Sequence, residues 1–125
     1  MATEILVNDG GAPARILPFT AGSTLSAGDP CQLTSGDEEV DAGTVSGARC
    51  LGVALTAATS GNVCNLISGR GVVLYVNCSG TIAAGDDVEM AGNGAMQDSK
   101  AVGNSVGIAL EDNTSGPNLK KVLLL

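Results

Sequence analysis

A sequence repeated within the chain constrains the fold more than any other feature. Residues 52–61 read GVALTAATSG, and residues 107–116, 55 positions later (107 − 52), read GIALEDNTSG. A second pair lies upstream, where residues 27–33 and residues 84–90 both begin with Ala-Gly-Asp. Each copy therefore contains an Ala-Gly-Asp turn, a strand, a variable loop, a Gly-(Val/Ile)-Ala-Leu strand, a Thr-Ser-Gly turn and a last strand. Because such self-similarity indicates a duplicated structural unit, the sequence predicts a domain of two related β units.

The composition restricts what can fill the core of this domain. A chain of 125 residues is expected to form one domain and to bury roughly 65% of its unfolded surface. Phe19 and Tyr75 are its only aromatic residues, so Val, Leu, Ile, Ala and Cys must supply the packing. Its 18 glycines are about twice the usual share of roughly 7%, which favours many tight turns. Only residues 91–101 could hold a helical turn or two. The predicted fold class is all-β: a compact β-barrel or β-sandwich, β-tulip-like, with little helix.

The N-terminal residues are expected to form an arm ahead of the β domain. A short apolar run at residues 5–7 is followed by the string NDGGAP, whose composition is that of a turn or linker. Residues 15–20 form a brief extended segment, which Pro18 confines to a sheet edge or an irregular stretch. The predicted boundaries are an extended arm over residues 1–21 and a β domain over residues 22–125, with the repeat at about 25–70 and 82–125. In the alternative, both apolar runs are ordinary strands of the domain.

The acidic residues are interpreted as turn and loop residues. Asp29 and Asp86 occupy equivalent positions in the repeat, where an Asp can accept hydrogen bonds from nearby backbone amides and close a turn. This position argues against a catalytic pair of carboxylates. The acidic run at residues 37–41 lacks the alternating oxygen ligands and the glycine of a calcium loop, so it is predicted to be an exposed loop.

The four cysteines, Cys31, Cys50, Cys64 and Cys78, are predicted to be buried free thiols. They contain no C-x-x-C pair, and the chain has no histidine, so a zinc site would need all four thiolates. Within the repeat, Cys31 aligns with Val88 and Cys64 with Leu119, which indicates small apolar strand residues. One or two disulfides are the main alternative.

The charge and the residue inventory exclude several classes of function. The net charge is −7, and the six Lys and Arg residues are scattered, which argues against nucleic acid and anionic membrane surfaces as partners. The chain begins without the basic region of a signal peptide and has no apolar run near the ~20 residues of a membrane span. We therefore expect it to be made in a cytoplasm. With no histidine to activate a nucleophile, neither a catalytic residue nor a cofactor site is predicted, and the protein is not expected to be an enzyme.

Several apolar and glycine-rich segments resemble a known family. These segments are residues 51–55, 61–67, 71–76, 82–88 and 106–110, within a resemblance that covers roughly residues 22–125. The family is that of the small capsid decoration or cement proteins of tailed phages, of the lambda head-decoration type. The resemblance implies a compact β fold that trimerises, sits on the outer capsid at three-fold and quasi-three-fold axes and clamps neighbouring capsomers. It also implies two partners, the major capsid protein and the chain itself, and a location on the outer surface of the virion. It implies no catalytic residues.

Two apolar runs are the predicted capsid contacts. They consist of Ile5, Leu6 and Val7, followed by Ile16, Leu17 and Phe19. An extended apolar arm can add a strand to the edge of a partner's sheet, and three arms of a trimer would act together. Two alternatives are a β-clip or barrel module that binds a small molecule or carbohydrate, and a component of a phage tail or spike.

Overall fold

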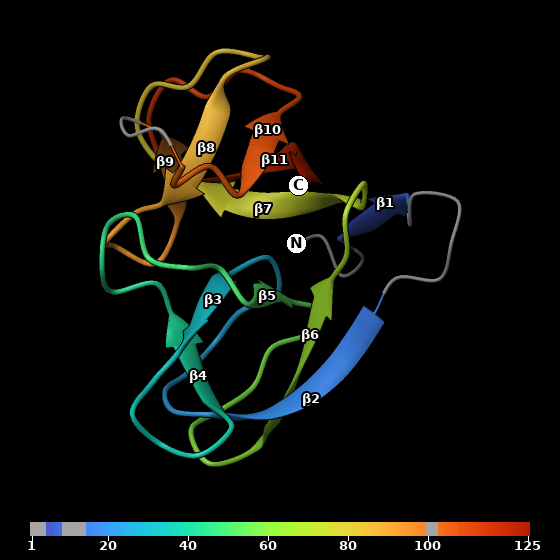
Figure 1. Cartoon of the computed structure of the whole chain (residues 1–125), viewed down its shortest axis with the longest axis vertical. Helices are drawn as coiled ribbons and strands as arrows, with labels where there is room; N and C mark the ends of the chain where they lie inside the picture. The colour runs from blue at the N-terminus through green and yellow to red at the C-terminus, as the bar shows by residue number, and fades with distance from the viewer. Residues whose placement is uncertain (1–4, 9–14, 100–102) are drawn as a thin grey trace.

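The structure is a computed structural model that describes residues 5–8, 15–99 and 103–125, and it consists of two stacked β units (Figure 1). Within the described residues there are eleven strands and no helix. In Figure 1 the first unit lies below the second, and the N-terminal strand lies beside the upper unit. None of the described residues belongs to a helix able to cross a membrane. The all-β prediction with two related units is confirmed.

The first unit is a closed barrel of five strands in the order β2-β4-β3-β5-β6. Its strands are β2 (Arg15–Ala21), β3 (Pro30–Leu33), β4 (Glu39–Ala42), β5 (Gly52–Ala54) and β6 (Val63–Ser68). Small apolar side chains fill its interior, among them Ala21, Cys31, Ala54 and Cys64. Such a core follows from a sequence with almost no aromatic residues.

The second unit repeats the strand order of the first. It contains β7 (Val73–Cys78), β8 (Asp87–Met90), β9 (Met96–Asp98), β10 (Gly107–Ala109) and β11 (Asn118–Leu124). Its sheet runs β7-β11-β10-β8-β9, and an additional pairing of β7 with β9 returns the sheet to its first strand. The isolated bridge between Leu25 and Ala58 in the first unit also recurs, between Ile82 and Asn113 in the second. The duplication seen in the sequence is therefore a duplication of the whole strand topology.

The two Ala-Gly-Asp turns are built in the same way. The Asp29 carboxylate accepts the Ser26 N–H at 2.9 Å, and the Asp86 carboxylate accepts the Ala83 N–H at 2.9 Å. The prediction that both carboxylates close turns is confirmed. The turns differ in their surroundings, because Gly28 is buried and Gly85 is exposed.

The pairing of the last strand differs from the sequence alignment by one residue. Ala54 pairs with Leu66 in the first unit, whereas the equivalent Ala109 pairs with Val122 in the second. Val122 is therefore the structural counterpart of Leu66, and the predicted match of Cys64 with Leu119 is wrong by one position. The physical reason is burial: this register places Val122 in the core and leaves Lys121 outside, with its Nζ 5.9 Å from the centre of the Tyr75 ring.

All four cysteines are free thiols, as predicted. Cys31, Cys64 and Cys78 are buried, and Cys50 is half-buried. Burial raises the pKa of every one of these thiols, to about 11 for Cys50 and for Cys78.

The segment Arg15–Ala21 departs from the expected arm. It forms β2, which pairs with β6 at six positions and runs parallel to β4 at Thr20 and Ala21. β2 opens the first unit as β7 opens the second. The units therefore begin at Arg15 and Val73, and the boundary expected after residue 21 lies inside a strand-bearing unit.

The N-terminal strand β1 (Leu6–Asn8) belongs to the second unit rather than to the first. It pairs antiparallel with β7, and the Ile5 carbonyl accepts the Tyr75 N–H at 2.8 Å. The Ile5 side chain is completely buried in the core of the second unit. The remainder of the expected arm, residues 1–4 and 9–14, lies outside the described residues.

Candidate interaction surface

The structure separates the six predicted contact residues into two groups. Ile5 is part of the core of the second unit and is not available to a partner. Leu6 and Val7 lie in β1, and their side chains are outside the described part of the structure. Ile16 and Leu17 on β2 are 51% and 43% exposed, and Phe19 packs partly against the core of the first unit. The β2 residues thus form the accessible group.

One edge of β2 is open along most of its length. β6 covers the other edge at six positions, but β4 pairs only with Thr20 and Ala21. The Thr20 N–H donates to the Glu38 carbonyl on the β4 side. Because backbone groups alternate along a strand, those of Ile16 and Pro18 face the same side as those of Thr20, where no described residue pairs with them.

Pro18 restricts what can pair with this open edge. Proline has no N–H, and within sheets it is confined to edges, strand starts and bulges. The open edge therefore offers the Ile16 N–H and the carbonyls of Ile16 and Pro18. A row of unpaired backbone groups is a template for unwanted strand pairing, and Pro18 removes one donor from it.

The equivalent edge in the second unit is covered. Leu17 pairs with Leu66 in the first unit, and Leu74 pairs with the equivalent Val122 in the second. Leu17 therefore corresponds to Leu74, and the next residue, Pro18, corresponds to Tyr75. Two segments cover this edge on β7. The Tyr75 N–H donates to the Ile5 carbonyl of the N-terminal segment, and the Asn77 N–H donates to the Gly28 carbonyl of the first Ala-Gly-Asp turn. The same molecule therefore contains one filled and one open copy of the same sheet edge.

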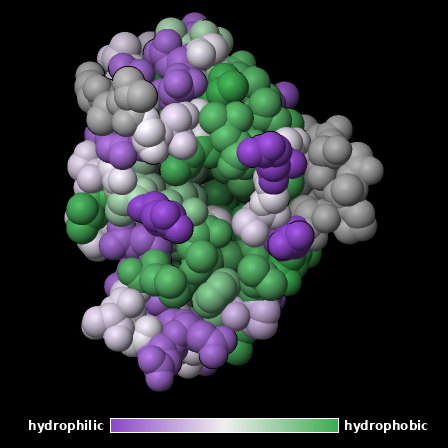
Figure 2. All heavy atoms as spheres, in the orientation of Figure 1, coloured by the Kyte–Doolittle hydropathy of each residue, from purple (hydrophilic) through white to green (hydrophobic). Residues whose placement is uncertain are grey.

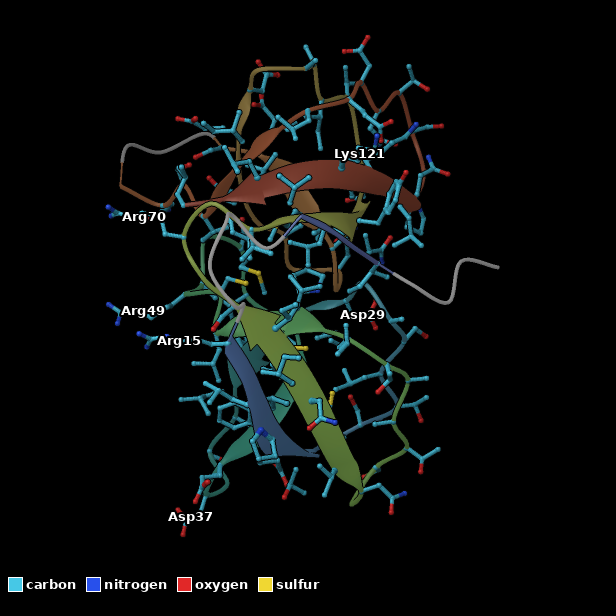
Figure 3. The ribbon with its side chains drawn as sticks, turned by 90° about the vertical axis from the view of Figure 1, so that its right-hand side faces the viewer. Arg15, Asp29, Asp37, Arg49, Arg70 and Lys121 are labelled. Carbon is cyan, nitrogen blue, oxygen red and sulfur yellow. The ribbon has the colours of Figure 1, made fainter. Side chains whose placement is uncertain are left out.

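An exposed apolar patch lies on the outer face beside this edge. Thr20 pairs with Val63 on β6, so Ile16, Pro18 and Val63 lie on one face of the strand pair, and Val63 is 66% exposed. Figure 3 shows β2 and β6 side by side on the side of the molecule that faces the viewer. We call Ile16, Pro18 and Val63 the β2 patch; Leu17 pairs with the buried Leu66 and therefore lies on the opposite face of β2. Apolar patches rimmed by polar residues mark interaction sites.

Acidic residues form part of the rim of the β2 patch. A shallow depression is lined by Pro18, Phe19, Thr20, Asp37, Glu38 and Val63. The exposed loop predicted over residues 37–41 is correct only for Asp37 and Glu38, which border the patch. The rest of the run is wrong, because it belongs to β4, where Val40 pairs with β2 and β3 and is buried in the core of the first unit. Val63 was not among the predicted contact residues. The sequence did contain a signal for it, because Val63 lies on the same face of β6 as the polar Asn65 and opposite to Cys64, and a polar neighbour on the same face indicates that the face is exposed.

The residues gathered here can bind but have no arrangement typical of catalysis. Among the described residues, no group of three or more His, Cys, Asp or Glu side chains could hold a metal ion. Burial raises the pKa of the Asp29 carboxylate, against opposing hydrogen bonds from Ser26 and Asn77. This carboxylate lies in the turn that contacts the second unit, away from the β2 patch.

The chain was compared with known proteins. A family model described as phage cement protein matches residues 12–124. The structure is similar to the crystal structure of the N base of the head fiber of bacteriophage phi29, with a TM-score of 0.73 and 16% sequence identity over 90% of this chain and 95% of that chain. At that identity the similarity shows a common fold. No curated protein sequence matches the chain.

Proposed function

The chain belongs to the family of phage cement proteins and is a capsid-associated structural protein, and on that premise we propose that it binds the outer surface of the assembled capsid as a trimer. In this proposal it contacts the major capsid protein and stabilises the shell by clamping neighbouring capsomers, after synthesis in the host cytoplasm. The family match over residues 12–124 is the observation that carries the proposal. The resemblance predicted from the sequence is confirmed at the level of the family.

The β2 patch supports a binding role for the first unit. Burying an exposed Val, Leu or Ile side chain completely contributes about 1.5–3 kcal/mol. Ile16 and Val63 are each more than half exposed, so together they would contribute about 2–3 kcal/mol per subunit, which corresponds to a weak contact. Three such contacts on one trimer would reinforce one another, because the second and third bind at a high effective concentration.

The test is co-sedimentation with expanded, undecorated capsids of the phage. Ile16→Ser combined with Val63→Ser should weaken binding at least about tenfold, since each substitution removes apolar contact area. Leu110→Ser is the matched control, because Leu110 is an exposed leucine of the second unit (43%) outside the β2 patch. Equal capsid binding by the double variant and the wild type would exclude the β2 patch as a contact.

Oligomeric state needs its own measurement. Light scattering of the free protein should give the mass of three chains, and a monomer at all concentrations would contradict the trimer. Deletion of residues 1–12 is not a clean test of an arm, because it removes Ile5 from the core of the second unit. Point substitutions on the surface keep the fold intact and are therefore preferred.

A further inference from the structure

All three arginines of the chain lie on one face of the molecule. Arg15 begins β2, Arg49 precedes β5, and Arg70 lies between β6 and β7. In Figure 3 their side chains project toward the same edge of the picture, which is the face turned to the reader in Figures 1 and 2. All three are exposed. No guanidinium among them forms a hydrogen bond or an ion pair with any described residue.

The rest of the described surface carries little positive charge. The chain has 13 Asp and Glu against six Lys and Arg. Of the lysines, Lys121 lies over the Tyr75 ring and points away from the arginines in Figure 3. The three arginines therefore give the middle of this face a local positive character, while Asp37 lies below them in Figure 3.

The surface between Arg49 and Arg70 is hollowed where the two units meet. One hollow is lined by residues that include Arg49 and Leu51, and a second by residues that include Leu51, Arg70 and Val106. A third contains Arg49 and Val106, so the three adjoin and form one groove across the junction. Figure 2 shows hydrophobic side chains around a hollow in this face. Leu33 and Leu125, which line the first two hollows, are 53% and 56% exposed.

We propose that this groove, with Arg49 and Arg70 at its borders and Arg15 nearby, docks a segment of the capsid surface in which carboxylates stand among apolar side chains. The proposal rests on the capsid-binding function proposed above and names the chemistry of the partner. An arginine can bind a carboxylate through two parallel hydrogen bonds, which fixes orientation as well as strength. The apolar part of the groove, around Leu33 and Leu51, supplies contact area, and displacing water from it strengthens the ion pairs beside it.

Charge complementarity selects this partner. A protein with a net charge of −7 repels polyanions at a distance, so three isolated arginines suit the few carboxylates of a protein surface. They also steer the encounter, because oppositely charged patches raise the association rate at low salt. Arg15 and Ile16 both belong to β2, so the arginines and the β2 patch share this strand, although successive side chains of a strand point to opposite faces.

The experiment compares Arg49→Gln combined with Arg70→Gln against Lys121→Gln as control. These substitutions remove the charge and keep an unbranched polar side chain, and both arginines are exposed and form no hydrogen bond or ion pair with a described residue, so denaturation midpoints should stay close to wild type. Binding to expanded, undecorated capsids is measured by co-sedimentation over a range of salt concentrations. We expect the double variant to bind about tenfold more weakly at low salt and to lose most of the salt dependence of the wild type, while Lys121→Gln binds as the wild type does.

Three results would overturn the inference, and they differ from one another. If the wild type binds capsids and the arginine variant binds equally well at every salt concentration, the groove is not the docking site. If the variant instead loses oligomeric mass in light scattering while its capsid binding is unchanged, the groove contacts a second copy of this chain. If the wild type itself does not bind capsids, the proposed function fails, and the inference fails with it.

Discussion

Substitution of Gly28 by alanine tests the contact between the two units. Gly28 and Gly85 hold the same place in the two Ala-Gly-Asp turns, with φ angles of 95° and 94°. Any side chain at such a φ costs about 1–3 kcal/mol of backbone strain, and this cost should be equal at the two positions. A Cβ added to Gly28 would lie 2.5 Å from Leu119 Cδ2 and 3.3 Å from the Tyr75 carbonyl oxygen, whereas one added to Gly85 meets nothing within 4 Å.

The difference between the two variants isolates the contact from the strain. Inserting a methyl group into a packed contact typically costs about 1–3 kcal/mol, so Gly28→Ala should lower the free energy of unfolding by about that much more than Gly85→Ala does. For a domain of this size the melting temperature falls by roughly 4 °C per kcal/mol. Urea denaturation of the free proteins at one fixed concentration measures the difference, since an oligomer adds to apparent stability.

A second substitution decides whether Leu119 is the cause. Leu119→Ala removes the clashing methyl group, so it should cost less in the Gly28→Ala background than in the wild type, with a coupling of about 1 kcal/mol. The reasoning would be refuted if Gly85→Ala destabilised the protein as much as Gly28→Ala. Such a result would mean that the first Ala-Gly-Asp turn does not pack tightly against β7 and β11.

Three further predictions follow from buried groups. Ile5→Ala should lower the free energy of unfolding by about 2–5 kcal/mol, because Ile5 is fully buried, while Ile16→Ala should change it by less than about 1 kcal/mol; chemical denaturation of both variants checks this. Burial raises the pKa of Asp29 above 3.8, so the native state binds the proton more tightly than the unfolded state, and any stability advantage of Asp29→Asn at neutral pH should shrink as pH falls toward 4. A constant difference across that pH range would contradict this. The thiols of Cys50 and Cys78, with pKa values raised to about 11, should resist iodoacetamide at pH 8 in the native protein and react fully in denaturant, as mass spectrometry can show.

The sequence was sufficient to predict the duplicated topology, because turns and short strands leave local signals. The glycine and aspartate of each Ala-Gly-Asp turn serve the turn itself, so their roles could be inferred without the rest of the fold. The burial of Cys31 followed from its place in the repeated strand, whereas Cys64 is buried although its structural counterpart in the second unit is Lys120. The register of the last strand could not be inferred, because it depends on which of Lys121 and Val122 reaches the core, and this is decided by tertiary packing.

The candidate surface was only partly predictable. Ile16 and Leu17 are adjacent and both apolar, so the sequence of β2 does not show which of its side chains face outward. Ile5 carried the same apolar signal as Ile16, yet one is buried and the other exposed, because the distant β7 covers only the first. The three arginines are separated by 34 (49 − 15) and 21 (70 − 49) positions, and only the folded arrangement brings them to one face.

The attachment of β1 to β7 imposes an order on how the chain folds as it is synthesised. The first unit ends at Ser68, so all its strands are available before β7 exists. The N-terminal strand, although made first, has no partner until Leu74 has left the ribosome. Domains fold as units during synthesis, and pairing between distant segments is slow. β1 is therefore among the last of the described segments to reach its native position, and it completes the second unit only after the first has formed.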